Sequence, residues 1–395
     1  ASRSRAHRPG SVSRANGTVV LFLGESNFGN IGSMVPALAD GFGQLGFDPV
    51  IIDIRRAGHE DRLFEVIGSR EVVAFISVSG FGLPPSPASD AVRIFNEADV
   101  PMLVVFLDHP FCLHDRVDLP LKNYHATFPS GHAGAFCERY IRPGGAFHHL
   151  PHSSVERATT PWAVRDIDLL LTGSLFLPPN TQRAAWGDHG ADVEGKLNDI
   201  VDLVWLDLAR PLEVSVREVL GEDVDFETLF PYMKTVDDYI RNAQRVDAIV
   251  ALADLRPTVI GLGWEAYADD LPLVRFVGQK TIEESLEMTD RSRAILNPFP
   301  GYNGSHERVF NAMAGGSAVL SSRSVYYESE FSPENMFFLP NRALDMRSAV
   351  ADLLADKDRL RAMAAAGQQR FLSAHTWTHR ARSLAQIGEI LPVAA

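Results

Sequence analysis

Short apolar runs alternate with longer mixed segments along most of this sequence, and this alternation restricts the fold more than any other feature. The runs are rich in Val, Ile, Leu and Phe and have the length of strands, whereas the segments between them carry apolar residues at helical spacing. This is the pattern of parallel strands joined by helices. The runs are residues 18–23, 49–54, 72–78, 101–107, 168–174, 257–263, 273–277, 294–297, 318–321 and 336–339.

The alternation stops once near the middle of the chain and then starts again. The break lies at residues 150–154, which include Pro151, and Pro161 follows shortly after. A chain of 395 residues is long enough for about two domains. We therefore predict an α/β protein with two Rossmann-like doubly wound domains, over residues 17–155 and 160–375, that face a cleft. Because loops at the carboxyl ends of the strands converge on such a cleft, we expect the functional site there.

Three segments lie outside this pattern. Residues 1–16 are polar and rich in Arg and Ser, and we predict a disordered tail. Residues 190–246 are rich in Leu, Val, Asp and Glu and poor in Gly, which predicts a helical insertion in the second domain. Residues 344–390 predict two or three helices, with breaks near Gly367 and around His375.

The charge balance narrows the possible partners. The chain has 37 Lys and Arg against 50 Asp and Glu, a net charge of −13, so its surface repels a nucleic-acid backbone but is compatible with a local basic pocket for one nucleotide. Cys112 and Cys137 are too few for a disulfide framework, which predicts a reducing, cytoplasmic location. No apolar run approaches the ~20 residues of a spanning helix. We expect membrane association to be peripheral at most.

The stretch from Asn297 to Leu320 is the most informative part of the sequence. A strand ends at Asn297, a loop rich in Pro and Gly follows, and a helix is predicted to start near Ser305, with Ser305 as its N-cap. Free backbone amides at a helix N-terminus suit a diphosphate. The candidate residues around this position are Asn303, Gly304, Ser305, His306, Arg308 and Asn311. Arg308 either contacts the diphosphate or pairs with Glu328 or Glu330 on the surface.

This stretch, with its Ala312-Met-Ala-Gly-Gly316 segment, resembles the nucleotide-sugar half of GT-B glycosyltransferases of the group 1 type. The signature of that type runs roughly Glu, seven residues, Glu, then Ala-Met-Ala-x-Gly. Its two Glu positions fall on Asn303 and Asn311 here. The resemblance covers the chain from the first strand to the terminal helices. Because Asn stands at both Glu positions, the identity of the donor stays open, and so does the stereochemistry of the transfer, which either retains or inverts the configuration of the sugar.

The resemblance implies a GT-B fold and a transfer of sugar from a nucleotide-diphosphate donor, held by the second domain, to an acceptor held by the first. The acceptor is a glycan, a protein or a small molecule. The enzyme would be hexosyltransferase-like and would need no metal or other cofactor. The last helix, within residues 376–395, would pack back on the first domain. The insertion at residues 190–246 has no counterpart that we can place in the resemblance; we expect it to enlarge the acceptor side or to form a homo-oligomer contact.

The resemblance also assigns donor contacts in the second domain. Gly173 lies in the loop after the first strand of that domain, and Arg183 is the first basic residue after this loop. Lys280 follows the strand and loop that would enclose the nucleoside base, and Asn311 would contact the ribose. Unless the cleft closes on them, Arg183 and Lys280 are expected to be solvated surface charges and not ligands.

Asp108, His109 and Glu25 are the candidate catalytic residues. Asp108 and His109 stand at the carboxyl end of a buried strand, before Pro110. By the resemblance, His109 would contact the sugar, and Asp108 would be a general base if the transfer inverts. The alternative is an Asp that caps a backbone amide beside an exposed His. Glu25, with Ser26 and Asn27, lies in a glycine-containing loop that would face the cleft; its alternative is a tight turn.

Other catalytic classes lack their motifs. The loop Gly24 to Gly32 does not match Gly-x-Gly-x-x-Gly, which argues against a nicotinamide or flavin enzyme. His148, His149 and His152 lie in a proline-bounded linker without the spacing of a metal site, so we expect no metal there.

Two alternative functions stay open. A nucleotide-sugar 2-epimerase has the same fold and converts the donor without any acceptor. A catalytically inactive GT-B module that binds a glycan or a protein is the other, because Asn replaces both acidic residues of the signature.

Overall fold

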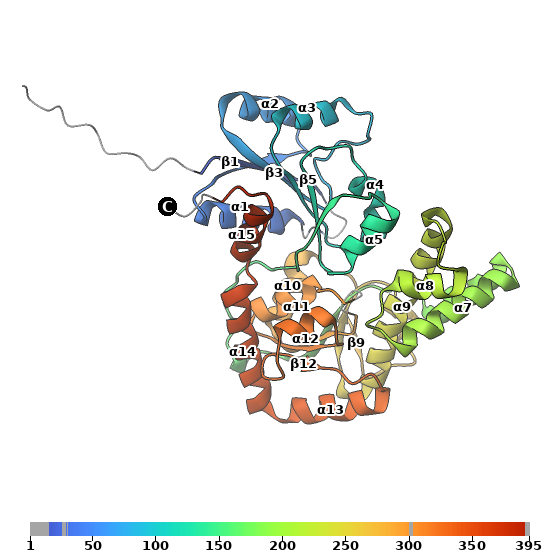
Figure 1. Cartoon of the computed structure of the whole chain (residues 1–395). Coiled ribbons are helices and arrows are strands. Elements are labelled where there is room, and N and C mark those ends of the chain that lie inside the picture. The colour runs from blue at the N-terminus through green and yellow to red at the C-terminus, as the bar shows by residue number, and fades with distance from the viewer. Residues whose placement is uncertain (1–15, 26–28, 30, 300–302, 392–395) are drawn as a thin grey trace, which may run out of the picture.

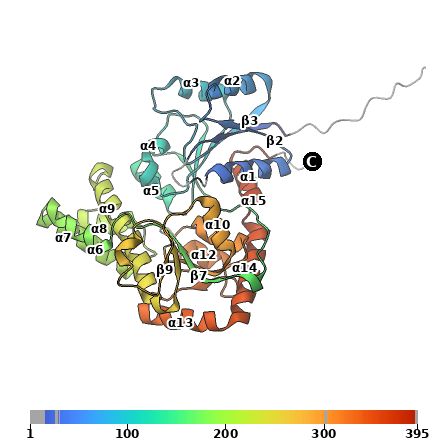
Figure 2. The same cartoon turned by 180° about the vertical axis from the view of Figure 1, so that it is seen from behind.

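The chain, seen here in a computed structural model, forms two parallel sheets, each covered by helices on both faces (Figures 1 and 2). The structure describes residues 16–25, 29, 31–299 and 303–391. The predicted tail therefore lies outside the described residues except for Asn16, and the loop candidates Ser26 and Asn27 also lie outside them.

The first sheet has the strand order β2-β1-β3-β4-β5-β6. Its strands are β1 (Thr18–Leu23), β2 (Asp48–Asp53), β3 (Val72–Val78), β4 (Met102–Val105), β5 (Tyr124–Phe128) and β6 (Ala146–His149). The apolar runs predicted the first four only, because β5 and β6 contain His and other polar residues. The assignment of His148 and His149 to a linker is therefore wrong, since they pair with Thr127 and Phe128 in the sheet.

Helices from both ends of the chain cover one face of this sheet. The apolar residues of α1 (Ile31–Gln44) pack in one cluster with those of α15 (Trp377–Ile387). Gly41 permits the close approach of these helices, since a Cβ there would lie 3.0 Å from the Thr378 Cα. The opposite face is covered by α2 (His59–Ser69), α3 (Asp90–Ala98), α4 (His114–Val117) and α5 (Ala133–Tyr140). The last helix of the chain thus belongs to the first domain (Figure 1).

The second sheet has the order β12-β11-β10-β7-β8-β9. Its strands, all predicted by apolar runs, are β7 (Ile167–Thr172), β8 (Thr258–Ile260), β9 (Arg275–Phe276), β10 (Ser292–Asn297), β11 (Ala318–Ser321) and β12 (Phe337–Phe338). Its helices include α10 (Ile282–Asp290), α11 (Glu307–Ala314), α12 (Val325–Glu330), α13 (Ala343–Ala355) and α14 (Lys357–Ala374). The predicted break near Gly367 is wrong, because α14 continues through it. Gly367 instead allows close packing, since a Cβ there would lie 3.0 Å from the Asn335 carbonyl oxygen.

A group of helices between β7 and β8 projects to one side of the second domain (Figure 1). It consists of α6 (Pro179–Ala184), α7 (Ala191–Leu206), α8 (Leu212–Leu220) and α9 (Phe226–Ala251). Their apolar residues form one buried cluster that also contains Phe111 and Phe136 of the first domain. The insertion therefore bridges the two domains.

Short 3-10 turns complete the described elements. They are η1 (Pro110–Leu113), η2 (Trp162–Val164), η3 (Ala185–His189), η4 (Ala253–Leu255) and η5 (Trp264–Tyr267). In the part of the chain that the structure describes, no helix combines the length and the apolar character needed to cross a membrane.

Candidate functional site

A cavity of about 900 Å³ lies between the two domains. Glu25, Gly29 and Asp108 line it from the first domain, and the loop after β7, together with α9, α10 and α11, lines it from the second. Most of the predicted site residues meet here, namely Glu25, Asp108, Gly173, Lys280, His306, Arg308 and Asn311. His109, Arg183, Asn303, Gly304 and Ser305 are described but are not among its lining residues.

The loop after β7 is fixed by its neighbours at the centre of this cavity. The indole nitrogen of Trp264 donates to the Gly173 carbonyl oxygen at 2.7 Å, and the Leu262 amide donates to the Ser174 hydroxyl at 3.1 Å. Gly261 has φ +144, and a Cβ there would lie only 2.3 Å from the Gly173 oxygen. The loops after β7 and β8 are therefore in direct contact, and Gly173 has a defined position.

Two guanidinium groups flank Gly173. Arg245 reaches it from α9 and Arg308 from α11, and a Cβ on Gly173 would lie 3.2 Å from Arg245 Nε and 3.4 Å from Arg308 Nη2. Arg245 donates to the Ser174 carbonyl oxygen at 2.7 Å. Arg308 donates to Thr172 Oγ1 at 3.0 Å and to Asn297 Oδ1 at 2.8 Å. The absence of a side chain on Gly173 leaves the space between the two cations open.

Neither cation of this pair has a carboxylate within ion-pair distance, although the charges of Asp237 and Glu307 act on Arg245 and Arg308 from farther away. Among the described residues neither Arg245 nor Arg308 forms an ion pair, and the buried Nε of Arg245 makes no hydrogen bond. Burial, and then the charge of Arg308, lowers the pKa of Arg245 to about 9. Burial also lowers the pKa of Arg308 to about 10. Both groups stay charged at neutral pH, so the space beside Gly173 favours an anion.

Sequence reasoning missed Arg245 and its neighbour Arg241, which also lines the cavity. Both lie on α9, one helical turn apart, in the segment that was predicted as a helical insertion and not as part of the site. The four-residue spacing was the available signal, because it puts both side chains on one helix face. Arg241 differs from Arg245 in that it pairs with Asp237 at 2.8 Å.

The predicted start of the phosphate-facing helix is wrong by one or two residues. α11 begins at Glu307, and its N-cap is His306, whose Nδ1 accepts a hydrogen bond from the Arg308 amide at 3.2 Å. The Ser305 hydroxyl is instead hydrogen bonded to the His152 ring at 2.9 Å. The amides of Ser305 and His306 donate to the Pro129 carbonyl and the Tyr327 hydroxyl, at 3.2 and 2.7 Å. These two amides are therefore not free to receive a diphosphate.

Asn303 and Gly304 face α12 instead of the cavity. Asn303 has φ 63, is 4% exposed, and accepts a hydrogen bond from the Val325 amide at 3.3 Å. The Gly304 carbonyl accepts from the Ser324 hydroxyl at 2.8 Å. The two residues thus hold the loop before α11 against α12.

The other predicted donor contacts divide between the cavity and the outside. Asn311 lines the cavity, and its Oδ1 accepts a hydrogen bond from the Ser154 hydroxyl at 2.6 Å. Lys280 also lines it and lies 3.6 Å from Glu284. Arg183 is exposed on α6 and donates to Asn198 of α7 at 2.8 Å. Arg308 pairs with neither of the surface carboxylates named as alternatives.

The three candidate catalytic residues have different environments. Asp108 and Glu25 are exposed residues that line the cavity from the domain opposite the two arginines. His109 instead accepts a hydrogen bond from the Phe111 amide at 3.4 Å and packs against the rings of Phe111 and Phe136. Burial lowers the pKa of His109 to about 3, so the ring is neutral at physiological pH. The predicted contact of His109 with a sugar is not supported by this placement.

The neighbouring histidines His148 and His149 make contacts within the first domain. His148 lies 3.3 Å from the ring nitrogen of His125, and His149 lies 3.2 Å from the Pro129 carbonyl oxygen. Across the described ranges, no group of three or more His, Cys, Asp or Glu side chains is placed to hold a metal ion.

Comparisons with known proteins agree with this architecture. Residues 241–386 match the family model described as glycosyl transferase-like. No curated protein matches the sequence. A glycosyltransferase from Rickettsia africae has a TM-score of 0.55 at 11% identity, covering 95% of this chain and 99% of its own. Sucrose-phosphate synthase from Thermosynechococcus elongatus has a TM-score of 0.52 at 13% identity, covering 93% and 97%.

A third similar structure is an alpha-glucosyltransferase in complex with UDP-glucose and DNA containing an abasic site. Its TM-score is 0.53 at 8% identity, covering 91% of this chain and 95% of its own. The likeness to all three extends over both domains. Residues 241–386 are therefore similar to a glycosyl transferase-like family, and the chain as a whole has the two-domain GT-B fold.

Proposed function

We propose that the protein is a glycosyltransferase that moves a sugar from a nucleotide-diphosphate donor to an acceptor. The observation that carries this proposal is the pair of guanidinium groups without ion-pair partners around Gly173, in the cavity between the two domains. Two cations that line this cavity together suit the diphosphate of such a donor. The structural likeness to an enzyme solved with UDP-glucose supports a hexose as the transferred sugar.

The proposed chemistry uses groups from both domains. As the bond between the sugar and the diphosphate breaks, negative charge grows on the leaving phosphate, and Arg245 and Arg308 stabilise it. Asp108 or Glu25, on the opposite wall, accepts the proton of the attacking acceptor hydroxyl. A base on the acceptor side corresponds to a transfer with inversion. The cleft between the domains holds donor and acceptor together.

Binding of nucleotides to the wild type and to two arginine variants tests the proposal. We expect UDP, GDP or dTDP to raise the melting temperature and to give a measurable Kd in calorimetry. The variant Arg245→Met should weaken this binding at least tenfold, because it removes one of the two cations. Arg183→Met is the control, since Arg183 lies outside the cavity lining. If no nucleoside diphosphate binds, the alternative of an inactive module is favoured.

A donor-only incubation separates the transferase from the epimerase. With UDP-glucose and no acceptor, a 2-epimerase converts the sugar, whereas a transferase gives only slow hydrolysis. Nuclear magnetic resonance of the sugar products detects either result. Epimerised sugar in the absence of acceptor would contradict the transferase proposal.

A further inference from the structure

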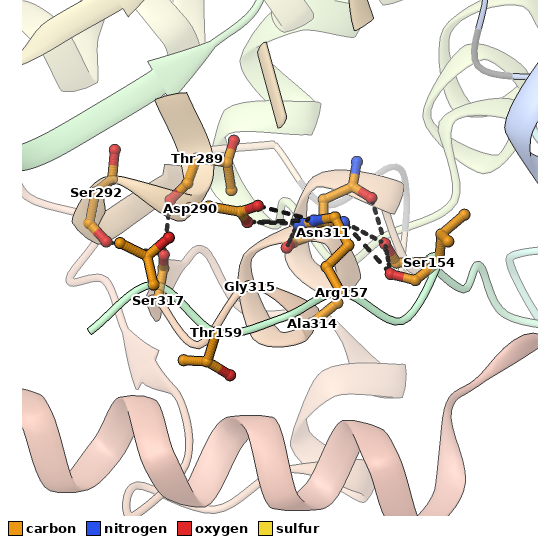
Figure 3. Close-up of polar contacts among 12 residues, drawn as sticks. Ser154, Arg157, Thr159, Thr289, Asp290, Ser292, Asn311, Ala314, Gly315 and Ser317 are labelled. Atoms are coloured by element: carbon orange, nitrogen blue, oxygen red, sulfur yellow. Dashed lines mark hydrogen bonds and ion pairs between the residues drawn. The ribbon is translucent and has the colours of Figure 1, made fainter. Parts of the chain in front are cut away.

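Asn311 is held by a network of polar contacts that includes residues of the linker between the domains (Figure 3). Asp290, at the end of α10, binds Arg157 of the linker through contacts of 2.9 to 3.2 Å. Arg157 Nη1 donates to the Ser154 hydroxyl at 3.2 Å, and Arg157 Nη2 donates to the Asn311 carbonyl oxygen at 2.7 Å. The Ser154 hydroxyl lies 2.6 Å from Asn311 Oδ1. These contacts connect the linker directly to the residue that lines the cavity.

The direction of each hydrogen bond in this chain follows from what its members can donate. Arg157 has only donors, so the Ser154 oxygen must accept from it. The single Ser154 proton is then available for one acceptor. Asn311 Oδ1 lies at 2.6 Å, whereas the other acceptor in reach, the Val155 carbonyl, lies at 3.4 Å. A separation of 2.6 Å fits an O–H···O bond and is short for an N–H···O bond.

This direction fixes the orientation of the Asn311 amide. Because Oδ1 accepts the hydrogen bond from Ser154, the Nδ2 group is the part of the amide that can contact a ligand in the cavity. In Figure 3 the amide nitrogen points away from Ser154. Among the described residues, none accepts a hydrogen bond from Nδ2. The position therefore offers two N–H donors to a ligand, whereas the carboxylate expected from the family signature would offer only acceptors.

We propose that Ser154 and Arg157 are positioning residues that orient Asn311, so that this site donates a hydrogen bond to a hydroxyl oxygen of the nucleotide ribose. The inference rests on the proposed function, because it takes the cavity ligand to be a nucleotide. The proposal adds that the ligand must accept the hydrogen bond that Asn311 Nδ2 donates. A ribose hydroxyl that is converted to an ether still accepts this bond. A carboxylate at position 311 has no N–H group and cannot donate it.

Calorimetry with UDP and its 2′- and 3′-O-methyl derivatives tests the direction of the bond. Asn311→Asp has nearly the same size as the wild type, so the steric cost of the methyl group cancels in the comparison. For each derivative we compare the ratio of its Kd to the Kd of UDP. For the derivative methylated at the hydroxyl that Asn311 contacts, we expect this ratio to be about tenfold higher in Asn311→Asp than in the wild type. An equal or lower ratio in the variant for both derivatives would overturn the proposal.

A double-mutant cycle tests the positioning role of Ser154. Ser154→Ala should weaken UDP binding about fivefold in the wild type and leave Kd unchanged when Asn311 is already Ala. An effect of equal size in both backgrounds would show that Ser154 acts structurally and not through Asn311. Ser153→Ala is the matched control, since the Ser153 hydroxyl donates to the His375 carbonyl at 2.6 Å and is not turned to Asn311.

A measurement without ligand keeps this inference separate from the proposed function. In the protein labelled with ¹⁵N at asparagine, the side-chain amide signal of Asn311 can be assigned by its loss in Asn311→Asp. We expect its protons to exchange rapidly with water, because they face the cavity, and the signal to shift in Ser154→Ala. Slow exchange would mean that the amide is turned to Ser154 and would contradict the proposal. Failure of all nucleotides to bind would refute the proposed function and the ribose contact, whereas the exchange measurement would still decide whether Ser154 orients the Asn311 amide.

Discussion

Replacing Arg245 with methionine should stabilise the ligand-free protein while weakening its binding of a nucleotide. Its pKa falls from 12.5 to about 9, mainly through burial. Since one pKa unit corresponds to about 1.4 kcal/mol, keeping the charge there costs the folded protein up to about 5 kcal/mol at neutral pH. The variant loses the hydrogen bond to the Ser174 carbonyl, which contributes about 1.5–3 kcal/mol. The balance favours the methionine variant by up to about 2–3.5 kcal/mol.

The same change removes a charged partner of the bound diphosphate. Hydrogen bonds to charged groups contribute about 1.5–3 kcal/mol, so Kd for the nucleotide should rise by about 10- to 150-fold. The two effects have opposite signs, which distinguishes a ligand-binding arginine from a structural one. A residue that only supported the fold would lower stability and leave Kd unchanged.

Thermal unfolding and calorimetry measure both effects on the same samples. We expect the melting temperature without ligand to rise by a few degrees in Arg245→Met, and the shift produced by UDP, or by whichever nucleotide binds best, to shrink. Arg183→Met should leave both quantities close to those of the wild type, because Arg183 is exposed and outside the cavity lining. A lower melting temperature combined with an unchanged Kd would refute the reasoning.

Three further predictions concern the cavity and the insertion. Gly173→Ala should raise Kd for the nucleotide at least tenfold with little loss of stability, since its Cβ would fill the space 3.2 Å from Arg245 Nε; calorimetry and thermal unfolding measure the two quantities. Asp108→Asn should lower kcat at least 100-fold and leave Kd for the donor nucleotide unchanged, and equal turnover would remove it as the base. Burial raises the pKa of Glu213 from 4.5 to about 6, which costs about 2 kcal/mol above pH 6 and nothing below about pH 4. Glu213→Gln should therefore be more stable than the wild type by up to about 2 kcal/mol at pH 8 and equally stable at pH 4 in urea unfolding.

The sequence predicted the central strands most clearly. β1, β3, β4 and β11 are apolar strands that are buried along most of their length, which is the property of central parallel strands. The two missed strands lie toward one edge of the first sheet, and β6 is the edge strand itself. Position alone does not explain the two misses, because the edge strands β2, β9 and β12 were predicted. Polar residues interrupt the apolar pattern in both missed strands, in the sequences YHATF of β5 and AFHH of β6.

The candidate site was only partly predictable from the sequence. Contacts between distant parts of the chain determine which residue caps α11 and which side chains lie beside Gly173. Ser305 is a good N-cap residue by type, yet its hydroxyl is bonded to His152, 153 positions earlier in the chain. His306 took the N-cap position instead. Gly173 was predicted from the loop after β7, whereas Arg245 was not, because 72 residues and a helical insertion separate them. Sequence spacing cannot show that α9 returns to this loop.

The position of α9 couples the cation pair to the arrangement of the domains. One part of the helix packs in the apolar cluster that includes Phe111 and Phe136 of the first domain, and a later turn carries Arg245 into the cavity. The apolar contact stabilises the placement of α9 before any ligand binds, and it opposes the repulsion between Arg245 and Arg308. The cationic site is therefore assembled in advance, with the two domains already in contact through the insertion. An anion bound beside the two guanidinium groups relieves their repulsion, and a site that is already assembled lowers the cost of reorganisation on binding.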